Sequence, residues 1–173
     1  PLDWGWDGSR PRSIARLHSS TRGHILRFLN SVEESGMWPE STRLAVAVLL
    51  PKPDGGFRPI GLLPWAVRPW SRARRLVTQR WELRNDRPWM YAGACKGAEV
   101  ATWKQAARAE AAAHSGEQYA QALLDLAKAF EVVPYRVMVR EAIRLQYPLW
   151  MLRLCIASYT MPRVIRVGTA VSR

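Results

Sequence analysis

The sequence has few cysteines and no long hydrophobic run. Its two cysteines, Cys95 and Cys155, lie far apart and belong to no Cys-x-x-Cys or Cys/His cluster, which argues against a zinc site. With only two thiols, a reducing, intracellular compartment is favoured. No apolar stretch reaches the length of a transmembrane helix, and the N-terminus at Pro1 carries no signal-peptide pattern.

Acidic residues are scarce as well. The 173 residues include 14 Asp and Glu against 26 Lys and Arg, which gives a net charge of +12. Hydrophobic residues make up 48%, so the chain is a basic globular protein and not a disordered polycation. A chain of this length suits one domain or two small lobes. The basic balance predicts a polyanionic partner.

The hydrophobic patterning predicts a mixed α+β fold. Helical spacing or composition indicates helices over residues 22–35, 64–85, 97–116, 135–147 and 149–159. We expect Gly36 and Gly116 to end the first and third of these, and the second to open at Pro64 or to be interrupted at Pro69. Short apolar runs predict strands over residues 119–124 and 162–167, the latter with Arg163 and Arg166 on one side.

A β-hairpin is predicted over residues 43–63, because two apolar runs flank Asp54-Gly55-Gly56. Pro51 and Pro59 cannot donate ladder hydrogen bonds, so both strands are expected to be edge-like. Lys52 and Arg58 would then project from the open end, a geometry that suits phosphate binding. The alternative is a solvated hairpin with two unrelated cations.

Asp125 stands between apolar residues at the end of the expected strand 119–124. Open α/β sheets bind ligands where buried strands end. Together with a second carboxylate from elsewhere, Asp125 could hold Mg²⁺ against substrate phosphates. The alternative is one turn of an amphipathic helix, with Asp125 and Lys128 as an i,i+3 surface pair.

The segment 64–85 carries six arginines against one acid, Glu82, with tryptophans between them. Arginine and tryptophan together offer phosphate contacts and flat surfaces for bases. One alternative is that the tryptophans are core and the arginines a solvated face; another is a basic helix lying on an anionic membrane. The residues are Arg68, Arg72, Arg74, Arg75, Arg80 and Arg84, with Trp65, Trp70 and Trp81.

In this order, the segments resemble the fingers and palm of a reverse transcriptase of the non-long-terminal-repeat retrotransposon and group II intron kind. Lys52-Pro53-Asp54-Gly55-Gly56-Phe57-Arg58-Pro59-Ile60 is similar to the family's K-x-D-G-x-x-R-P-I hairpin, and Asp125-Leu126-Ala127-Lys128-Ala129-Phe130 to its D-[FL]-x-K-A-F first palm motif. Gly36-Met37-Trp38-Pro39 resembles its G-x-[WF]-P motif. Tyr91-Ala92-Gly93-Ala94 stands where the family has G-F-x-x-G, and residues 163–168 resemble the segment entering the next palm motif.

The resemblance implies a fingers subdomain over residues 1–117 and the first part of a palm over residues 118–173, ending before the second palm motif. It implies binding of an RNA template, a DNA primer and a dNTP, and no membrane. By position, it implies that Asp125 and the Leu126 carbonyl bind catalytic Mg²⁺, and that Phe130 is the gate under the sugar. It implies that the triphosphate is bound by Lys52, Arg58 and the backbone of Lys128 and Ala129. For the nucleic acid it implies Arg68, Arg72, Arg74, Arg75 and Arg80.

The chain also departs from the family pattern. Glu131 stands where the family commonly has Asp, and the aromatic position of its G-F motif is altered around residues 91–95. The carboxylates of the family's later aromatic-x-Asp-Asp turn are not among these residues, so we expect a fragment that does not polymerise alone. The second hypothesis is a non-catalytic basic nucleic-acid-binding protein that uses Lys52, Arg58 and the segment 68–84.

Overall fold

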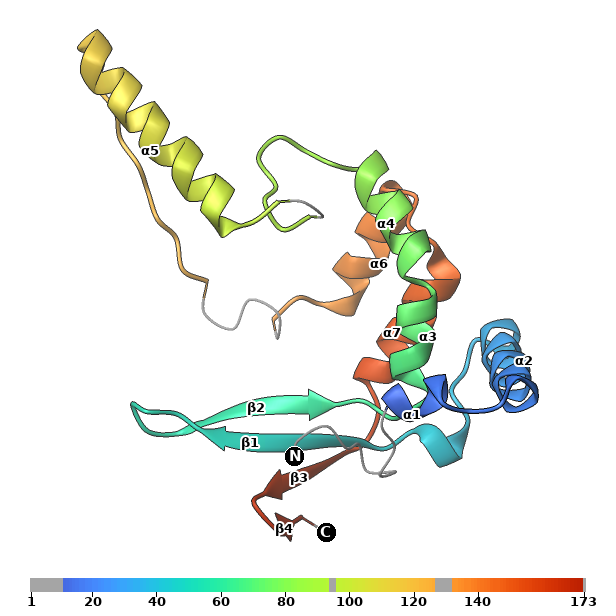
Figure 1. The fold of residues 1–173 in the computed structure, drawn as a ribbon. Helices are drawn as coiled ribbons and strands as arrows, with labels where there is room; N and C mark the ends of the chain where they lie inside the picture. Colours follow the sequence, from blue (N-terminus) through green and yellow to red (C-terminus); the bar gives the residue numbers. More distant parts are fainter. Residues whose placement is uncertain (1–10, 94–95, 127–131, 173) are drawn as a thin grey trace. The chain divides into compact units, whose positions relative to one another are not determined.

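The computed structural model describes residues 11–93, 96–126 and 132–172 (Figure 1). These residues form seven α-helices, one short 3-10 helix and a four-stranded mixed sheet, so the predicted α+β class is confirmed. The chain divides into two compact units. Unit 1 comprises Pro1–Arg75 and Val139–Arg173, and unit 2 comprises Leu76–Met138. Each unit is described by itself.

The N-terminal helices belong to unit 1. A short helix, α1, spans Pro11–Ala15, and α2 spans Ser19–Ser35, three residues longer at its start than predicted. His18 caps α2, since its ring nitrogen accepts a hydrogen bond from the Ser20 N–H at 3.4 Å. Gly36 ends α2 as predicted, with a left-handed φ of 65° and its N–H bonded to the Val32 carbonyl at 2.9 Å.

We expect Gly36→Ala to lower the free energy of unfolding by about 1–2 kcal/mol, because a side chain at this φ is strained. An added Cβ would also lie 2.5 Å from the Arg153 guanidinium, which would have to move. Gly23→Ala is the matched control inside α2, where the nearest atom to an added Cβ is 3.8 Å away. That change should stabilise by about 0.5–1 kcal/mol. Urea denaturation of both variants checks the opposite signs; equal effects would contradict the structure of this helix end.

Four strands make the sheet of unit 1: β1 (Ala45–Pro51), β2 (Phe57–Leu62), β3 (Arg163–Val167) and β4 (Ala170–Val171), in the order β2-β1-β3-β4. The predicted hairpin is confirmed, with Pro51 opposite Phe57 across the antiparallel β1–β2 pair. Gly55 and Gly56 both have positive φ, at 90° and 77°, which explains the paired glycines at the turn.

The expectation that both hairpin strands lie at an edge is right for β2 and wrong for β1. β1 also pairs in parallel with β3, over Ala45–Val48. Pro51 lies beyond that paired stretch, so its missing N–H removes no bond from the β1–β3 ladder. Sequence spacing could not predict this pairing, because it joins segments more than 100 residues apart.

The expectation that Arg163 and Arg166 share one side of their strand is also wrong. Side chains alternate along a strand, and residues three apart therefore point to opposite faces. The strand itself is confirmed, since β3 covers residues 163–167 of the predicted 162–167. Its pairing sets Arg163 beside Ala45 and Arg166 beside Val48.

Unit 1 is held together by a core of large side chains between its helices. Trp38, Trp70, Leu154 and Val32 are its largest fully buried side chains. Trp38 and Trp70 make an edge-to-face pair with ring centroids 5.5 Å apart. The Trp38 indole N–H donates to the Leu154 carbonyl at 3.0 Å, which joins the segment after α2 to α7 (Leu149–Tyr159).

The predicted helix over residues 64–85 is two helices, α3 (Val67–Ala73) and α4 (Arg75–Arg84), interrupted at Arg74 and not at Pro69. Pro69 lies in the first turn of α3, where its missing N–H breaks no helical bond. Arg74 has φ −89° and ψ 2°, and its N–H bonds the Trp70 carbonyl at 3.0 Å. The interruption therefore falls on the residue whose side chain binds Glu33, as described below.

The remaining predicted helices are confirmed as α5 (Ala98–Ser115), α6 (Tyr135–Arg144) and α7. Gly116 ends α5 with φ 69°, as expected. The predicted strand over residues 119–124 is wrong: residues 117–126 form no regular element, and Leu123 and Leu124 are 85% and 88% exposed. An apolar run forms a strand only against a partner, and the sheet of the described residues provides none for this run.

Candidate nucleotide and nucleic-acid interface

The β1–β2 turn presents two cations in an open setting. The Lys52 N–H bonds the Gly56 carbonyl at 3.1 Å, and the Gly55 N–H bonds the Lys52 carbonyl at 3.2 Å, so the backbone of the turn is fixed by its own hydrogen bonds. Lys52 and Arg58 are both exposed, as is the whole stretch from Pro51 to Gly61. Neither side chain makes a hydrogen bond or ion pair within the described residues, which leaves both cations open to an anionic ligand.

Asp125 and Leu126 are exposed and lie in the irregular segment 117–126. Lys128, Ala129 and Phe130, the other residues of the predicted nucleotide site in this stretch, lie outside the described residues. Among the residues that the structure describes, no three His, Cys, Asp or Glu side chains gather as metal ligands would. Mg²⁺ is usually held by one or two protein carboxylates together with water and substrate phosphates, so Asp125 would supply one ligand of the site that the resemblance implies.

The arginines of residues 68–84 differ in exposure. Arg72, Arg75, Arg80 and Arg84 are exposed, whereas Arg68 and Arg74 are half-buried. Arg80 and Arg84 are four residues apart on α4, and the Arg84 Nε donates to the Arg80 carbonyl at 3.2 Å. Four of these six arginines are thus exposed, one on α3 and three on α4, within the segment for which the sequence predicts a nucleic-acid contact.

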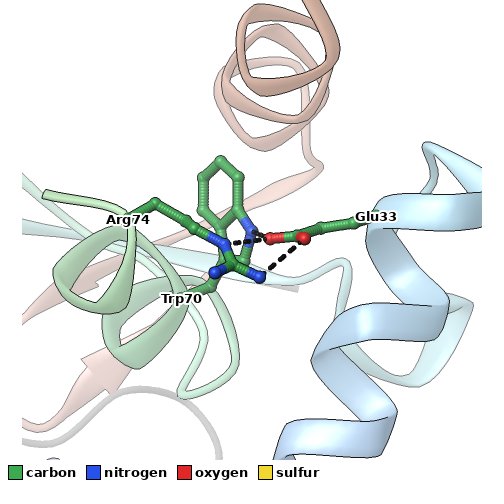
Figure 2. Close-up of polar contacts among 3 residues, drawn as sticks. All are labelled: Glu33, Trp70 and Arg74. Carbon is green, nitrogen blue, oxygen red and sulfur yellow. Dashed lines mark hydrogen bonds and ion pairs between the residues drawn. The ribbon is translucent and has the colours of Figure 1, made fainter. Parts of the chain in front are cut away.

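Arg74 is held inside unit 1 by Glu33 of α2 (Figure 2). Its Nε and Nη2 donate to the two Glu33 carboxylate oxygens at 2.5 and 2.7 Å, and the Trp70 indole N–H donates to the same carboxylate at 2.7 Å. The Arg74 guanidinium also lies over the Trp150 ring, 5.9 Å from its centroid. The hydrogen bond to Glu33 raises the pKa of Arg74. We therefore assign Arg74 to the packing of α2 against α3, and not to phosphate binding.

Trp65 and Trp70 do not present the freely exposed rings that the sequence pattern predicts. Trp70 is 2% exposed and belongs to the core. Trp65 is half-buried and stacks on Phe28 with ring centroids 5.7 Å apart. The alternative that these tryptophans are core is thus correct for Trp70, whose indole N–H bonds Glu33 of α2 and whose ring packs on Trp38.

Two strongly exposed tryptophans, to which the sequence analysis assigned no role, lie in unit 2. Trp89 and Trp103 are 71% and 77% exposed. Tyr91 is two residues from Trp89, and Lys104 of α5 is next to Trp103. The Lys104 ammonium lies over the Tyr91 ring, 5.4 Å from its centroid. The signal in the sequence is an aromatic residue next to a cation, as in Trp103-Lys104, inside an otherwise alanine-rich helix.

Several other cations are paired at the surface. Lys96 binds Asp86 at 2.6 Å, and this hydrogen bond lowers the pKa of Asp86. Arg144 and Arg140 bind Glu141 at 2.6 and 3.1 Å and lower its pKa, Arg144 having the larger effect. Exposed ion pairs of this kind add little stability. They do show which basic residues already have an anionic partner.

Two further features lie apart from these cations. A hollow of about 610 Å³ in unit 1 is lined by Met37, Trp38, Glu40, Arg43, Leu44, Ala157, Thr160, Met161 and Pro162. Burial raises the pKa of the Cys155 thiol, which makes a reactive thiolate unfavourable at neutral pH. Neither feature contains a predicted site residue, although Met37 and Trp38, which line the hollow, belong to the G-x-[WF]-P motif.

No helix in the described part of the chain is long and apolar enough to cross a bilayer. The chain matches no protein-family model, and its comparisons with curated proteins and with solved structures gave no match. The assignment to reverse transcriptases therefore rests on the motifs quoted above.

Proposed function

We propose that the chain is the template- and nucleotide-binding segment of an RNA-directed DNA polymerase of the non-long-terminal-repeat retrotransposon and group II intron type. The observation that carries this proposal is the hairpin. The segment with the K-x-D-G-x-x-R-P-I pattern forms the turn and the start of β2 in the β1–β2 hairpin, and both of its cations are exposed. A triphosphate carries several negative charges, and charge-assisted hydrogen bonds from Lys and Arg are the strong ones.

The rest of unit 1 supports the proposal by anchoring that hairpin. β1 is fixed on its second side by β3, and its Val46 and Val48 are buried. Trp38, from the motif that precedes the hairpin, is locked to Trp70 and to the Leu154 carbonyl. The hairpin tip therefore projects from a rigid base, which is what a residue that positions phosphates requires.

In the proposed role, Lys52 and Arg58 hold the triphosphate, while the exposed arginines of α3 and α4 hold a nucleic-acid backbone. Arg58 can bind two phosphate oxygens through its planar fork, whereas Lys52 acts as a point charge. Asp125, Leu126 and Phe130 remain predictions from the motif. The polymerase of which this segment would be part transfers a nucleotide to a primer end with loss of pyrophosphate.

The direct test is the affinity for a fluorescently labelled dNTP, measured by anisotropy. The double variant Lys52→Ala/Arg58→Ala should bind at least about tenfold more weakly, since it removes two charge-assisted contacts. The control is Arg16→Ala/Arg22→Ala, which removes the same two charges from exposed positions of unit 1 that have no predicted role. Equal weakening of the two double variants would show a general charge effect and would overturn the assignment of the hairpin.

A second candidate function is a basic nucleic-acid-binding protein without catalysis. It is favoured by the exposed Arg72, Arg80 and Arg84, which can contact phosphates without any metal site. The two functions differ in ligand choice. A binding protein of this kind should bind oligonucleotides and leave a free dNTP unbound, and the hairpin variants should then change oligonucleotide binding alone.

A further inference from the structure

The register of the sheet brings a third cation to the hairpin. Across the β1–β2 pair Leu50 is opposite Arg58, and across the β1–β3 pair Val48 is opposite Arg166. Leu50 and Val48 are two residues apart on β1, so their side chains share one face of the sheet. Directly paired residues point to the same side, and Arg58 and Arg166 therefore project from that same face, on either side of β1.

Burial on this face differs between β1 and the neighbouring strands. Val46 and Val48 of β1 are buried, whereas Ile60 and Arg166, which flank Val48 on the neighbouring strands, and Arg58 nearer the tip are exposed. Strand spacing and rise place the Arg58 and Arg166 Cα atoms about 12 Å apart, two strands over and two residues along. Two long guanidinium side chains can converge on one ligand across that distance.

The Arg166 side chain is held in place at its base. Its Nε donates to the Gly168 carbonyl at 2.9 Å, across the β3–β4 turn, where Gly168 has φ 59°. The two terminal amino groups of Arg166 make no hydrogen bond within the described residues. A guanidinium that is anchored through Nε loses less freedom when its outer edge binds an anion.

Arg163, three residues earlier on the same strand, is placed differently. It lies on the opposite face, beside Ala45, and its Nη2 donates to the Tyr159 carbonyl at 2.6 Å. The two arginines have the same charge and the same strand, and both are exposed. They differ in the face that they occupy.

From this placement we propose that Arg166 is a further phosphate-binding residue, which acts with Lys52 and Arg58 on the phosphates of a nucleotide or of a nucleic-acid strand. The inference rests on the proposed function, because it assigns a third cation to the same site. It adds a residue that the resemblance does not assign, from a segment that the sequence reading placed in the palm. The sheet itself supplies the reason: parallel pairing of β1 and β3 puts the C-terminal ends of both strands at the same side.

The test compares Arg166→Ala with Arg163→Ala in the full chain, using a labelled dNTP and a labelled single-stranded oligonucleotide as separate probes. Arg166→Ala should weaken binding of at least one probe about tenfold, as expected for one charge-assisted contact. If the oligonucleotide is the ligand, the salt slope should also become shallower by about 0.7, the value for one phosphate on a single strand. Arg163→Ala should leave both affinities within about twofold, since its side chain lies on the other face.

Arg166→Lys separates phosphate binding from the turn contact. Lysine keeps the charge but has no Nε donor for the Gly168 carbonyl, so binding should recover to within about threefold of the unchanged chain. Loss of binding in Arg166→Lys as large as in Arg166→Ala would assign Arg166 to the turn and overturn the proposal. Equal losses in Arg163→Ala and Arg166→Ala would overturn it as well. If the unchanged chain binds neither probe, the proposed function falls together with this inference.

Discussion

The affinity of this chain for a DNA duplex should fall about 500-fold between 50 and 200 mM salt. Arg74 is paired with Glu33, and the other basic residues of the chain, the exposed Arg72, Arg80 and Arg84 among them, are expected to neutralise about five phosphates. Each neutralised phosphate contributes a slope of about −0.9 in log affinity against log salt, and five give about −4.5. A fourfold rise in salt then lowers the affinity by roughly 2.7 logarithmic units.

The measurement is a series of anisotropy titrations at fixed pH. Two single variants test which arginines act. Arg72→Ala removes an exposed cation and should make the slope shallower by about 0.9. Arg74→Ala removes a cation that is already paired, so the slope should stay unchanged while the protein becomes less stable. A slope that is flat in the unchanged chain would rule out binding through phosphates, and binding to anionic vesicles would then favour the membrane alternative for residues 64–85.

Local sequence patterns predicted most of the elements. Helical spacing and the glycines at 36 and 116 placed α2 and α5, and Asp54-Gly55-Gly56 placed the hairpin turn. These features depend on residues close together in the chain, which a single sequence displays directly. The pairing of β3 with β1 and the failure of residues 119–124 to form a strand depend on distant partners. No spacing rule within either segment contains that information.

In the candidate site, too, features set by nearby residues were predictable and features that depend on distant partners were not. Exposure of Lys52 and Arg58 follows from turn chemistry and was predictable. The assignment of Arg74 to packing was not, because Glu33 is 41 residues away and only the folded chain brings the two together. Composition counts both Arg72 and Arg74 as free cations. The structure separates them, and it also moves Trp70 from the candidate surface to the core.

We expect Trp38→Ala to lower the free energy of unfolding of unit 1 by about 3–5 kcal/mol, the usual range for a large aromatic side chain removed from a core. Trp38 is 1% exposed, packs edge-to-face on Trp70 and donates its indole N–H to the Leu154 carbonyl. Domains of this size are stable by only about 5–15 kcal/mol, so the variant could lose a third or more of the total. Urea denaturation followed by circular dichroism avoids interference from the other tryptophans.

Trp38→Phe and Trp103→Ala make the result interpretable even where Trp38→Ala fails to fold. Phenylalanine keeps an aromatic ring but leaves the Leu154 carbonyl without its indole donor, which should cost about 1–3 kcal/mol. Trp103 is 77% exposed on α5, so Trp103→Ala should change stability by no more than about 0.5 kcal/mol. If Trp38→Phe proved as harmless as Trp103→Ala, the buried contact between Trp38 and α7 would be wrong. A graded loss would instead show that Trp38 joins the segment before β1 to α3 and α7, at the end of β1 opposite to Lys52.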